Sequence, residues 1–160
     1  MGRMTGPALP SPPTTGDVVD LSVPASPAYV AVVRTATAGL AARVDITLDR
    51  IEDLRIAVDE ACALLVRGTD HASRQPDPDD VLHCRFVLHE ESLTIEVRGP
   101  WAPLPEHDSF AWSVLSALVD GLECGHGAGP DADSAAPGSD QPADGTWLRL
   151  VVRRGTGSWS

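Results

Sequence analysis

Two adjacent carboxylates, Asp59 and Glu60, lie within the stretch VDEACALLV (58–66), whose other residues have the composition of a buried helix. A carboxylate that is removed from water without a partner carries a large energetic cost or a large pKa shift. One turn later the chain has Leu64, which offers Glu60 no polar atom. The residues alone favour a half-exposed helix carboxylate that is paired with an arginine.

Histidine and cysteine side chains are a second source of chemistry, because both are zinc ligands. The candidates are His83, Cys84, His89, Cys124 and His126. Their spacing matches no compact site, so ordinary strand and loop positions are favoured and no metal is expected. The cysteines form no C-x-x-C pair, and Cys62 falls on an apolar helix face as a small buried hydrophobe. A serine hydrolase is disfavoured because G-x-S-x-G is missing from the sequence.

Arg34 is the side chain best placed to bind a partner. The helix expected from Pro27, after the N-cap candidate Ser26, has an apolar stripe at helical spacing. The stripe consists of Tyr29, Val32, Val33, Ala36 and Leu40. Arg34 lies off that stripe and is expected to face solvent or a partner, where a planar guanidinium makes several directed hydrogen bonds. A solvated helix arginine is the alternative.

The overall charge disfavours several classes of partner. The net charge is −11, and all twelve basic residues are arginine. Binding to nucleic acid or to an anionic membrane needs clustered positive charge, so neither partner is expected. Residues 1–16 contain no apolar signal-peptide core, and no apolar run approaches the ~18 residues that would span a bilayer. We therefore expect a cytoplasmic protein.

The composition along the chain predicts one domain over residues 17–154. Residues 1–16 are rich in proline and glycine and are predicted to form a disordered arm. The acidic, low-complexity stretch at about 125–144 is predicted to be a flexible insert, and 155–160 a tail.

Hydrophobic periodicity predicts seven elements within that domain. They are a strand over 17–23, a helix from Pro27, a helix from about Thr47 to Gly68, a hairpin over 81–99, a helix over 109–122 capped by Asp108 or Ser109, and a strand over 145–154. The order β-α-α-β-β-α-β predicts an α/β fold, a two-layer sandwich with a mixed, mostly antiparallel sheet and helices on one face.

One long stretch, SPAYVAVVRTATAGLAARVDITLDRIEDLRIAVDEAC (26–62), resembles a known family. It is similar to the anti-sigma-factor serine kinases of the GHKL (Bergerat-fold) ATPases, the RsbW-like group. Weaker similarity follows in LTIEVRG, SALVDGL and GTWLRLVVRR, so that the resemblance covers roughly residues 17–154. It looks closest to actinobacterial anti-sigma factors of the sporulation and stress type.

The resemblance assigns roles to the residues of the expected nucleotide site. The family's N box, Glu-x-x-x-Asn, supplies a base toward the nucleophile and an oxygen ligand for Mg²⁺. Glu60 takes the place of the base, but Leu64 replaces the Asn and cannot ligate Mg²⁺. The adenine-binding box, Asp-x-Gly-x-Gly, is replaced by Gly99, Trp101 and Pro103.

The remaining boxes are only partly kept. The phosphate-binding Gly-x-Gly, whose backbone N–H groups cradle phosphate, is replaced by Ser109 and Ala111. The family's final Gly-Thr is retained as Gly145 and Thr146. These replacements imply a site that no longer binds ATP or Mg²⁺, with Glu60 as the remnant of a base.

The aromatic residues near these boxes are expected to fill the emptied cleft as part of the core. They are Trp101, Phe110 and Trp112. An aromatic box for a ligand is the alternative.

The resemblance implies a regulator of transcription that works by direct binding. Such a protein sequesters an alternative sigma factor, is released by an anti-anti-sigma (STAS) protein, and forms a homodimer. Arg34 occupies the first-helix position at which the family presents an arginine to both partners. Two alternatives remain: an active serine kinase that phosphorylates the antagonist, and a scaffold that binds only the antagonist.

Overall fold

The computed structural model describes residues 16–71, 77–129 and 145–155. The elements, in chain order, are β1 (Asp17–Pro24), α1 (Pro27–Arg43), α2 (Leu48–His71), β2 (Val81–Leu88), β3 (Ser92–Gly99), α3 (Phe110–Leu118), β4 (Gly121–His126) and β5 (Thr146–Arg153). The predicted arm over 1–16, apart from its last residue, lies outside the described residues, as do 130–144 of the predicted insert and 156–160 of the tail.

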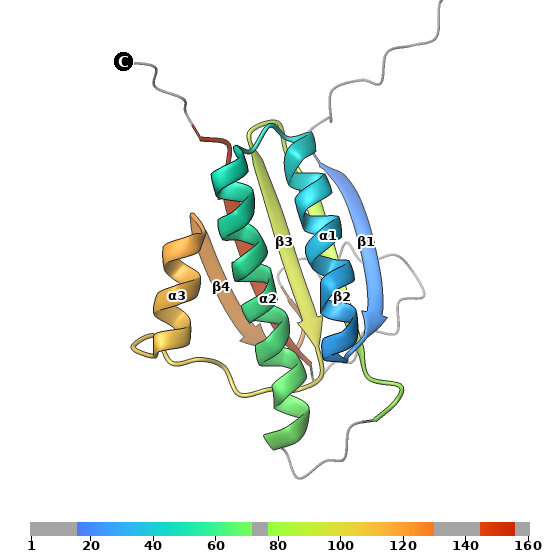
Figure 1. Ribbon diagram of the computed structural model, residues 1–160. Helices are drawn as coiled ribbons and strands as arrows, with labels where there is room; N and C mark the ends of the chain where they lie inside the picture. Colours follow the sequence, from blue (N-terminus) through green and yellow to red (C-terminus); the bar gives the residue numbers. More distant parts are fainter. Residues whose placement is uncertain (1–15, 72–76, 130–144, 156–160) are drawn as a thin grey trace, which may run out of the picture.

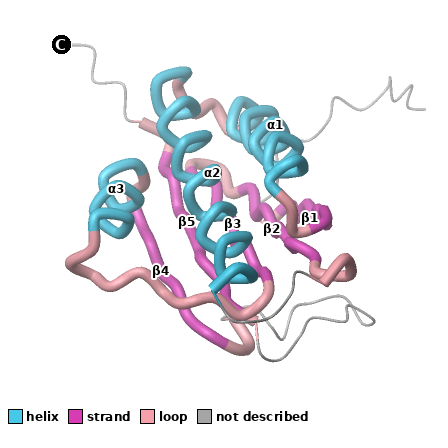
Figure 2. Tube along the Cα trace, turned by 60° about the horizontal axis from the view of Figure 1, so that its bottom comes forward, coloured by secondary structure: helices cyan, strands magenta, loops and turns pink. Residues whose placement is uncertain are grey.

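The strands form one sheet in the order β1-β2-β3-β5-β4, and each neighbouring pair is antiparallel. All three helices lie on the same face, with α1 toward the β1 edge, α2 across the middle and α3 at the β4 edge (Figures 1 and 2). The predicted two-layer α/β sandwich is therefore confirmed, and its described pairings are antiparallel throughout rather than mixed.

The core lies between the helices and the sheet. In β2, alternate residues from Leu82 to Leu88 are buried, because successive side chains of a strand point to opposite faces. From α2, Leu54, Val58 and Leu65 are fully buried against them. Cys62 is also fully buried, as predicted, and its hydrogen bond with Cys84, together with burial, raises the pKa of the Cys62 thiol.

The buried side of α1 differs from the predicted stripe. Val33 and Ala41 are fully buried, and so is Thr37, whose Oγ1 donates to the Val33 carbonyl at 2.8 Å. Tyr29 and Val32 are 45% and 46% exposed, so their predicted place in the core was wrong. Because α1 is apolar around most of its circumference, the spacing of apolar residues did not determine which side it buries.

Strand β4 was missed by the sequence analysis, which continued the third helix to residue 122 and began the flexible insert at 125. The helix ends at Leu118. Asp120, just after the helix, accepts a hydrogen bond from the backbone N–H of Arg153 at 2.7 Å and forms an ion pair with Arg50 at 2.6 Å. Within β4, Gly125 leaves room for Trp147, since a Cβ there would lie 2.8 Å from the indole. The second helix also runs past Gly68 to His71.

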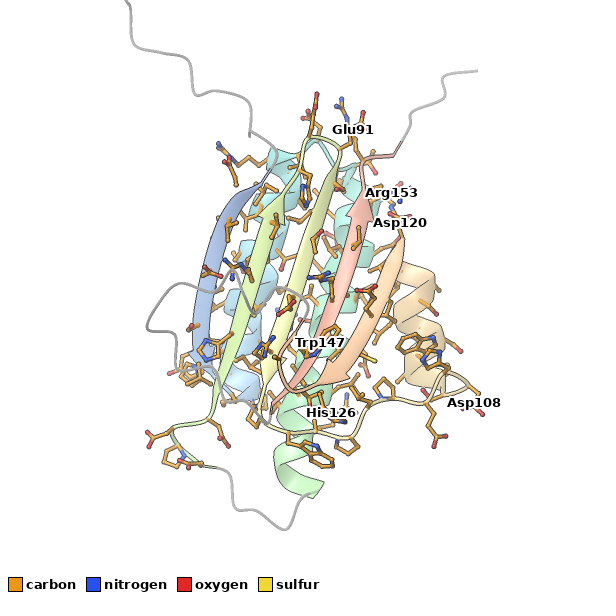
Figure 3. The ribbon with its side chains drawn as sticks, turned by 180° about the vertical axis from the view of Figure 1, so that it is seen from behind. Glu91, Asp108, Asp120, His126, Trp147 and Arg153 are labelled. Atoms are coloured by element: carbon orange, nitrogen blue, oxygen red, sulfur yellow. The ribbon has the colours of Figure 1, made fainter. Side chains whose placement is uncertain are left out.

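A row of alternating charges crosses the face of the sheet opposite the helices, the face toward the viewer in Figure 3. The row joins directly opposed residues of all five strands: Asp20, Arg85, Glu96, Arg149 and Glu123. Arg85 lies 3.7 Å from Asp20, and Arg149 lies 3.6 Å from Glu96 and 3.7 Å from Glu123. Opposite charges directly across from each other favour this register over a shifted one.

His83 lies beside this row and is expected to make stability depend on pH. Its Nδ1 is 2.9 Å from Ser22 Oγ, and its cross-strand neighbour is Arg98. Burial, followed by the positive charge of Arg98, lowers the pKa of His83 from its usual 6.5, while Asp20 opposes the shift. The unfolded chain therefore takes up this proton at a higher pH than the folded chain, so the free energy of unfolding falls as pH drops below about 6.5.

Denaturant unfolding at pH 7.5 and 5.5 tests this dependence. We expect wild type to lose more stability between the two pH values than His83→Gln, which cannot take up the proton. An equal loss in both proteins would contradict the assignment to His83.

Candidate functional site

Arg34 on α1 forms an ion pair with Asp59 on α2, with Nη1 and Oδ2 2.8 Å apart. Both side chains are a little more than a third exposed, so Arg34 is less open to solvent than predicted. The pair lies in a groove between the two helices. One oxygen of Asp59 is thus hydrogen-bonded to Arg34, which lies 25 positions earlier in the chain. No local sequence pattern indicates this pairing.

Glu60 pairs with Arg67, which also lines the groove, and Oε1 lies 3.4 Å from Nη2. Its side chain is one-third exposed. Leu64, one turn further on, packs against the core. Glu60 thus has the geometry of the half-exposed, arginine-paired helix carboxylate, and Leu64 brings no polar atom toward it.

Gly99 occupies the position that the resemblance assigns to an adenine-binding Asp, and a side chain there would have to displace its neighbours. A Cβ placed on Gly99 would lie 2.9 Å from Leu82 Cδ2 and 3.2 Å from Leu65 Cβ. The residues that would surround such a carboxylate are themselves fully buried hydrophobes. The residues present at this position therefore do not fit an adenine contact.

The hydroxyl of the retained Thr146 makes its hydrogen bonds with other residues of the chain. Its hydroxyl accepts from the Ala102 N–H at 2.8 Å, donates to the Ala102 carbonyl at 3.0 Å, and lies 3.0 Å from His126 Nδ1. Gly145 is buried and its carbonyl accepts from Gly127 N at 2.8 Å. The Gly-Thr pair thus holds the 100–103 segment and the end of β4 together.

The aromatic side chains near the expected nucleotide site do not fill a cleft, contrary to prediction. Trp101 is 49% exposed and stacks on His126 with ring centroids 5.5 Å apart, and Phe110 is 84% exposed. Trp112 stacks on His107 at 4.2 Å. Figure 3 shows His126 at the lower end of the sheet, below Trp147. The apolar filling comes instead from aliphatic residues around Gly99.

Ser109 caps α3, as predicted, and the cap takes up one of the N–H groups at the helix start, where the resemblance places phosphate. Its Oγ accepts from the backbone N–H of Trp112 at 3.2 Å. An N–H that is bonded to a cap is not available to an anion. Ala111 is half-buried, and Pro103 is exposed.

The described residues also bear on metal and membrane sites. Among them, no group of three or more His, Cys, Asp or Glu side chains could hold a metal ion. Of the zinc candidates, His83 and Cys84 lie in β2 and His89 directly follows it, whereas Cys124 and His126 lie in β4. No described helix is both long and apolar enough to cross a membrane.

Comparison with known sequences identifies the family. The sequence profile of the histidine kinase-like ATPase domain matches residues 23–128, more than half of the chain. This protein belongs to that family. The matched residues run from the end of β1 to just past β4, so Leu64 and Gly99 both lie within the match.

Several curated relatives share substantial sequence identity with this ATPase-like domain. The anti-sigma-F factor RsbW of Mycobacterium tuberculosis is 31% identical over 146 residues, which span 88% of this chain and 76% of the relative. The serine-protein kinase RsbW of Bacillus subtilis is 40% identical over 94 residues, 59% of this chain. For the Bacillus relatives, the aligned region spans about half of the relative's length.

A solved structure confirms the fold. The crystal structure of the RsbU and RsbW domains of Rv1364c from Mycobacterium tuberculosis aligns with a TM-score of 0.59 at 16% identity. The alignment covers 86% of this chain and 32% of that one. At 16% identity, this similarity supports a shared arrangement of helices and strands.

Proposed function

We propose that this protein is an anti-sigma factor that sequesters an alternative RNA polymerase sigma factor by direct binding, without using a nucleotide. The observation that carries the proposal is its relation to an anti-sigma-F factor over 88% of its length. Arg34 supplies a half-exposed cation on a helix that also exposes the apolar side chains of Tyr29 and Val32. Release would come from an anti-anti-sigma (STAS) protein that competes for an overlapping surface, and the regulator would act as a homodimer.

The loss of ATP binding is part of this proposal. Leu64 stands where Mg²⁺ would need an oxygen ligand. Gly99 supplies no carboxylate for the adenine, and Leu82 and Leu65 pack closely against it. The phosphate end is capped by Ser109. The metal and the base thus each lack a group that would hold them, and one N–H at the phosphate end is already bonded to the cap.

Calorimetric titration with Mg-ATP is expected to show no measurable binding. A dissociation constant below about 100 μM, which corresponds to roughly −5.5 kcal/mol, would contradict this prediction and favour an enzyme. Titration in the presence of EDTA separates binding through Mg²⁺ from binding of the nucleotide alone.

The second candidate function is an active serine-protein kinase that transfers the γ-phosphoryl group of ATP to a serine of the anti-anti-sigma protein. It is favoured by the presence of Glu60 at the position of the family's base and by 40% identity to a serine-protein kinase. Incubation of the purified protein with labelled ATP and STAS proteins from the same genome tests it. Label transfer that is lost in Glu60→Ala would establish this candidate, whereas no transfer leaves the binding function.

A further inference from the structure

The outer face of the sheet, opposite the helices, has a positively charged centre in a protein whose net charge is −11. Glu96 of β3 is directly opposed by Arg85 on one side and by Arg149 on the other. It also accepts from Arg98 at 3.1 Å. Three guanidinium groups therefore surround one carboxylate, while the other two carboxylates of the row lie on the edge strands, 61% and 64% exposed. The centre of this face is thus suited to an anionic partner.

This centre is deeply buried, although it lies on the side of the sheet that has no helices. The side chains of Arg98 and Glu96 are 4% and 9% exposed, and that of Arg149 is 17% exposed. From the described part of the chain, the segment 127–129 lies against the centre. The Gly127 carbonyl accepts from Arg98 at 3.0 Å, and a Cβ added to Gly129 would overlap the Arg98 guanidinium.

Two polar atoms on this face are buried without a hydrogen-bond partner among the described residues. They are Oε2 of Glu96 and Nε1 of Trp147, which is the cross-strand neighbour of Arg98 (Figure 3). The Arg149 nitrogen that pairs with Oε2 is 3.6 Å away, too far for a hydrogen bond. A buried acceptor and a buried donor without partners cost free energy. An extended segment laid on the face supplies a backbone N–H to the first and an oxygen to the second.

The segment 130–144, which connects β4 to β5, has the chemistry that this face requires. It begins directly after Gly129, which is buried against Arg98 and Glu96. It contains no basic residue, and its remaining residues are small or polar. Its four aspartates are Asp131, Asp133, Asp140 and Asp144. A segment of this composition matches a charged sheet face rather than an apolar core.

The segment is also long enough to cross the face. Its fifteen residues can span at most about 50 Å. From β3, where Gly129 lies, the path to β1 crosses two strand spacings and the return to β5 crosses three, which amounts to about 24 Å. Because β4 already pairs with β5, the ends of the segment are held near each other, and docking loses less entropy than binding of a free peptide.

We propose that the acidic segment 130–144 docks on the outer face of its own sheet, with aspartates against Arg85 and Arg149 and a backbone N–H against Glu96 Oε2. The inference is independent of the proposed anti-sigma function. It replaces the flexible insert that composition predicts with a segment held by charge. While the segment is docked, the outer face is not available to an acidic segment of another protein.

Chemical modification of arginine tests this docking. Phenylglyoxal reacts with accessible guanidinium groups, and mass spectrometry of peptides gives the rate at each arginine of the full chain. Replacing all four aspartates of the segment with asparagine should raise the rates at Arg85 and Arg149 by about threefold or more. High salt should do the same in wild type, because it screens the contact. Arg43, at the exposed end of α1, should react equally throughout.

A matched variant separates the position of the charges from their number. It replaces four exposed carboxylates of other loops with amides: Glu90→Gln, Glu91→Gln, Glu106→Gln and Asp108→Asn. The rates at Arg85 and Arg149 should then stay at the wild-type level. Circular dichroism shows whether each variant is folded.

Three outcomes would overturn the proposal. If the asparagine variant is folded and Arg85 and Arg149 react no faster than in wild type, the segment does not cover this face. Equal acceleration in the matched variant would show that net charge, rather than docking of 130–144, determines the rates. Protection in wild type that grows with protein concentration would assign the cover to a second copy of the chain.

Discussion

Replacing Arg34 with glutamate is expected to weaken sigma-factor binding by about 30-fold to several-thousand-fold, because charge reversal in an interface costs about 2–5 kcal/mol. The change removes the guanidinium donors and leaves a carboxylate where the partner presents acceptors. The protein should stay folded, since the buried side of α1 is formed by Val33, Thr37 and Ala41. Calorimetric titration with the sigma factor measures the effect.

Two further variants separate the interface from the ion pair within the chain. The half-exposed Arg34–Asp59 pair itself contributes about 0–1 kcal/mol to folding. The double variant Arg34→Glu with Asp59→Arg restores a pair of reversed polarity and should be as stable as wild type, yet still bind poorly. Arg43→Glu, the same change at the exposed end of the same helix, should bind nearly as well as wild type. Wild-type affinity in Arg34→Glu would show that this face does not contact the partner.

The same comparison distinguishes binding from catalysis. In the kinase candidate Glu60 abstracts a proton, a step that the binding function does not use. Glu60→Ala should therefore keep full sigma-factor binding and full regulation. Loss of regulation in Glu60→Ala with binding intact would favour the kinase.

The second large effect concerns stability. Glu96→Gln is expected to lower the free energy of unfolding by about 3–5 kcal/mol, because removal of one member of a buried charge pair leaves the other unpaired. Glu96 and Arg98 have side chains that are 9% and 4% exposed, with Oε1 and Nη2 3.1 Å apart, and Arg149 lies 3.6 Å from the other carboxylate oxygen. The amide keeps the shape of the side chain, so a loss in chemical denaturation reports the charge.

Glu123→Gln provides the matched control for that prediction. Glu123 lies in the same row of charges and pairs with the same Arg149, but its side chain is 64% exposed. Exposed pairs contribute about 0–1 kcal/mol, so this change should be nearly neutral. Equal losses in the two variants would contradict the importance of burial in this row.

Local signals in the sequence predicted most of the fold. Pro27 after Ser26 marks the start of α1, Ser109 caps α3, and the alternating residues of β2 and β3 place a hairpin correctly. Strand β4 carried only a weak signal, because its two apolar residues, Leu122 and Cys124, make a very short alternation between two glycines. Its place at the edge of the sheet depends on pairing with β5, which lies about 20 residues later in the chain.

The candidate site was less predictable, because its contacts join separate helices. The paired, half-exposed state of Glu60 was among the expected alternatives, since Arg67 lies two turns further along the same helix. The pairing of Arg34 with Asp59 depends on how α1 packs against α2. The periodicity of apolar residues did not predict that packing. The exposure of Trp101 and Phe110 was missed because Leu65 and Leu82, rather than aromatic rings, close the space around Gly99.

The most direct test of the proposed function is titration of the wild-type protein with each sigma factor of the same genome, with and without Mg-ATP. We expect one sigma factor to bind, with the same dissociation constant under both conditions. Binding that requires Mg-ATP would contradict the nucleotide-independent mechanism, and binding to none of the sigma factors would contradict the anti-sigma function itself.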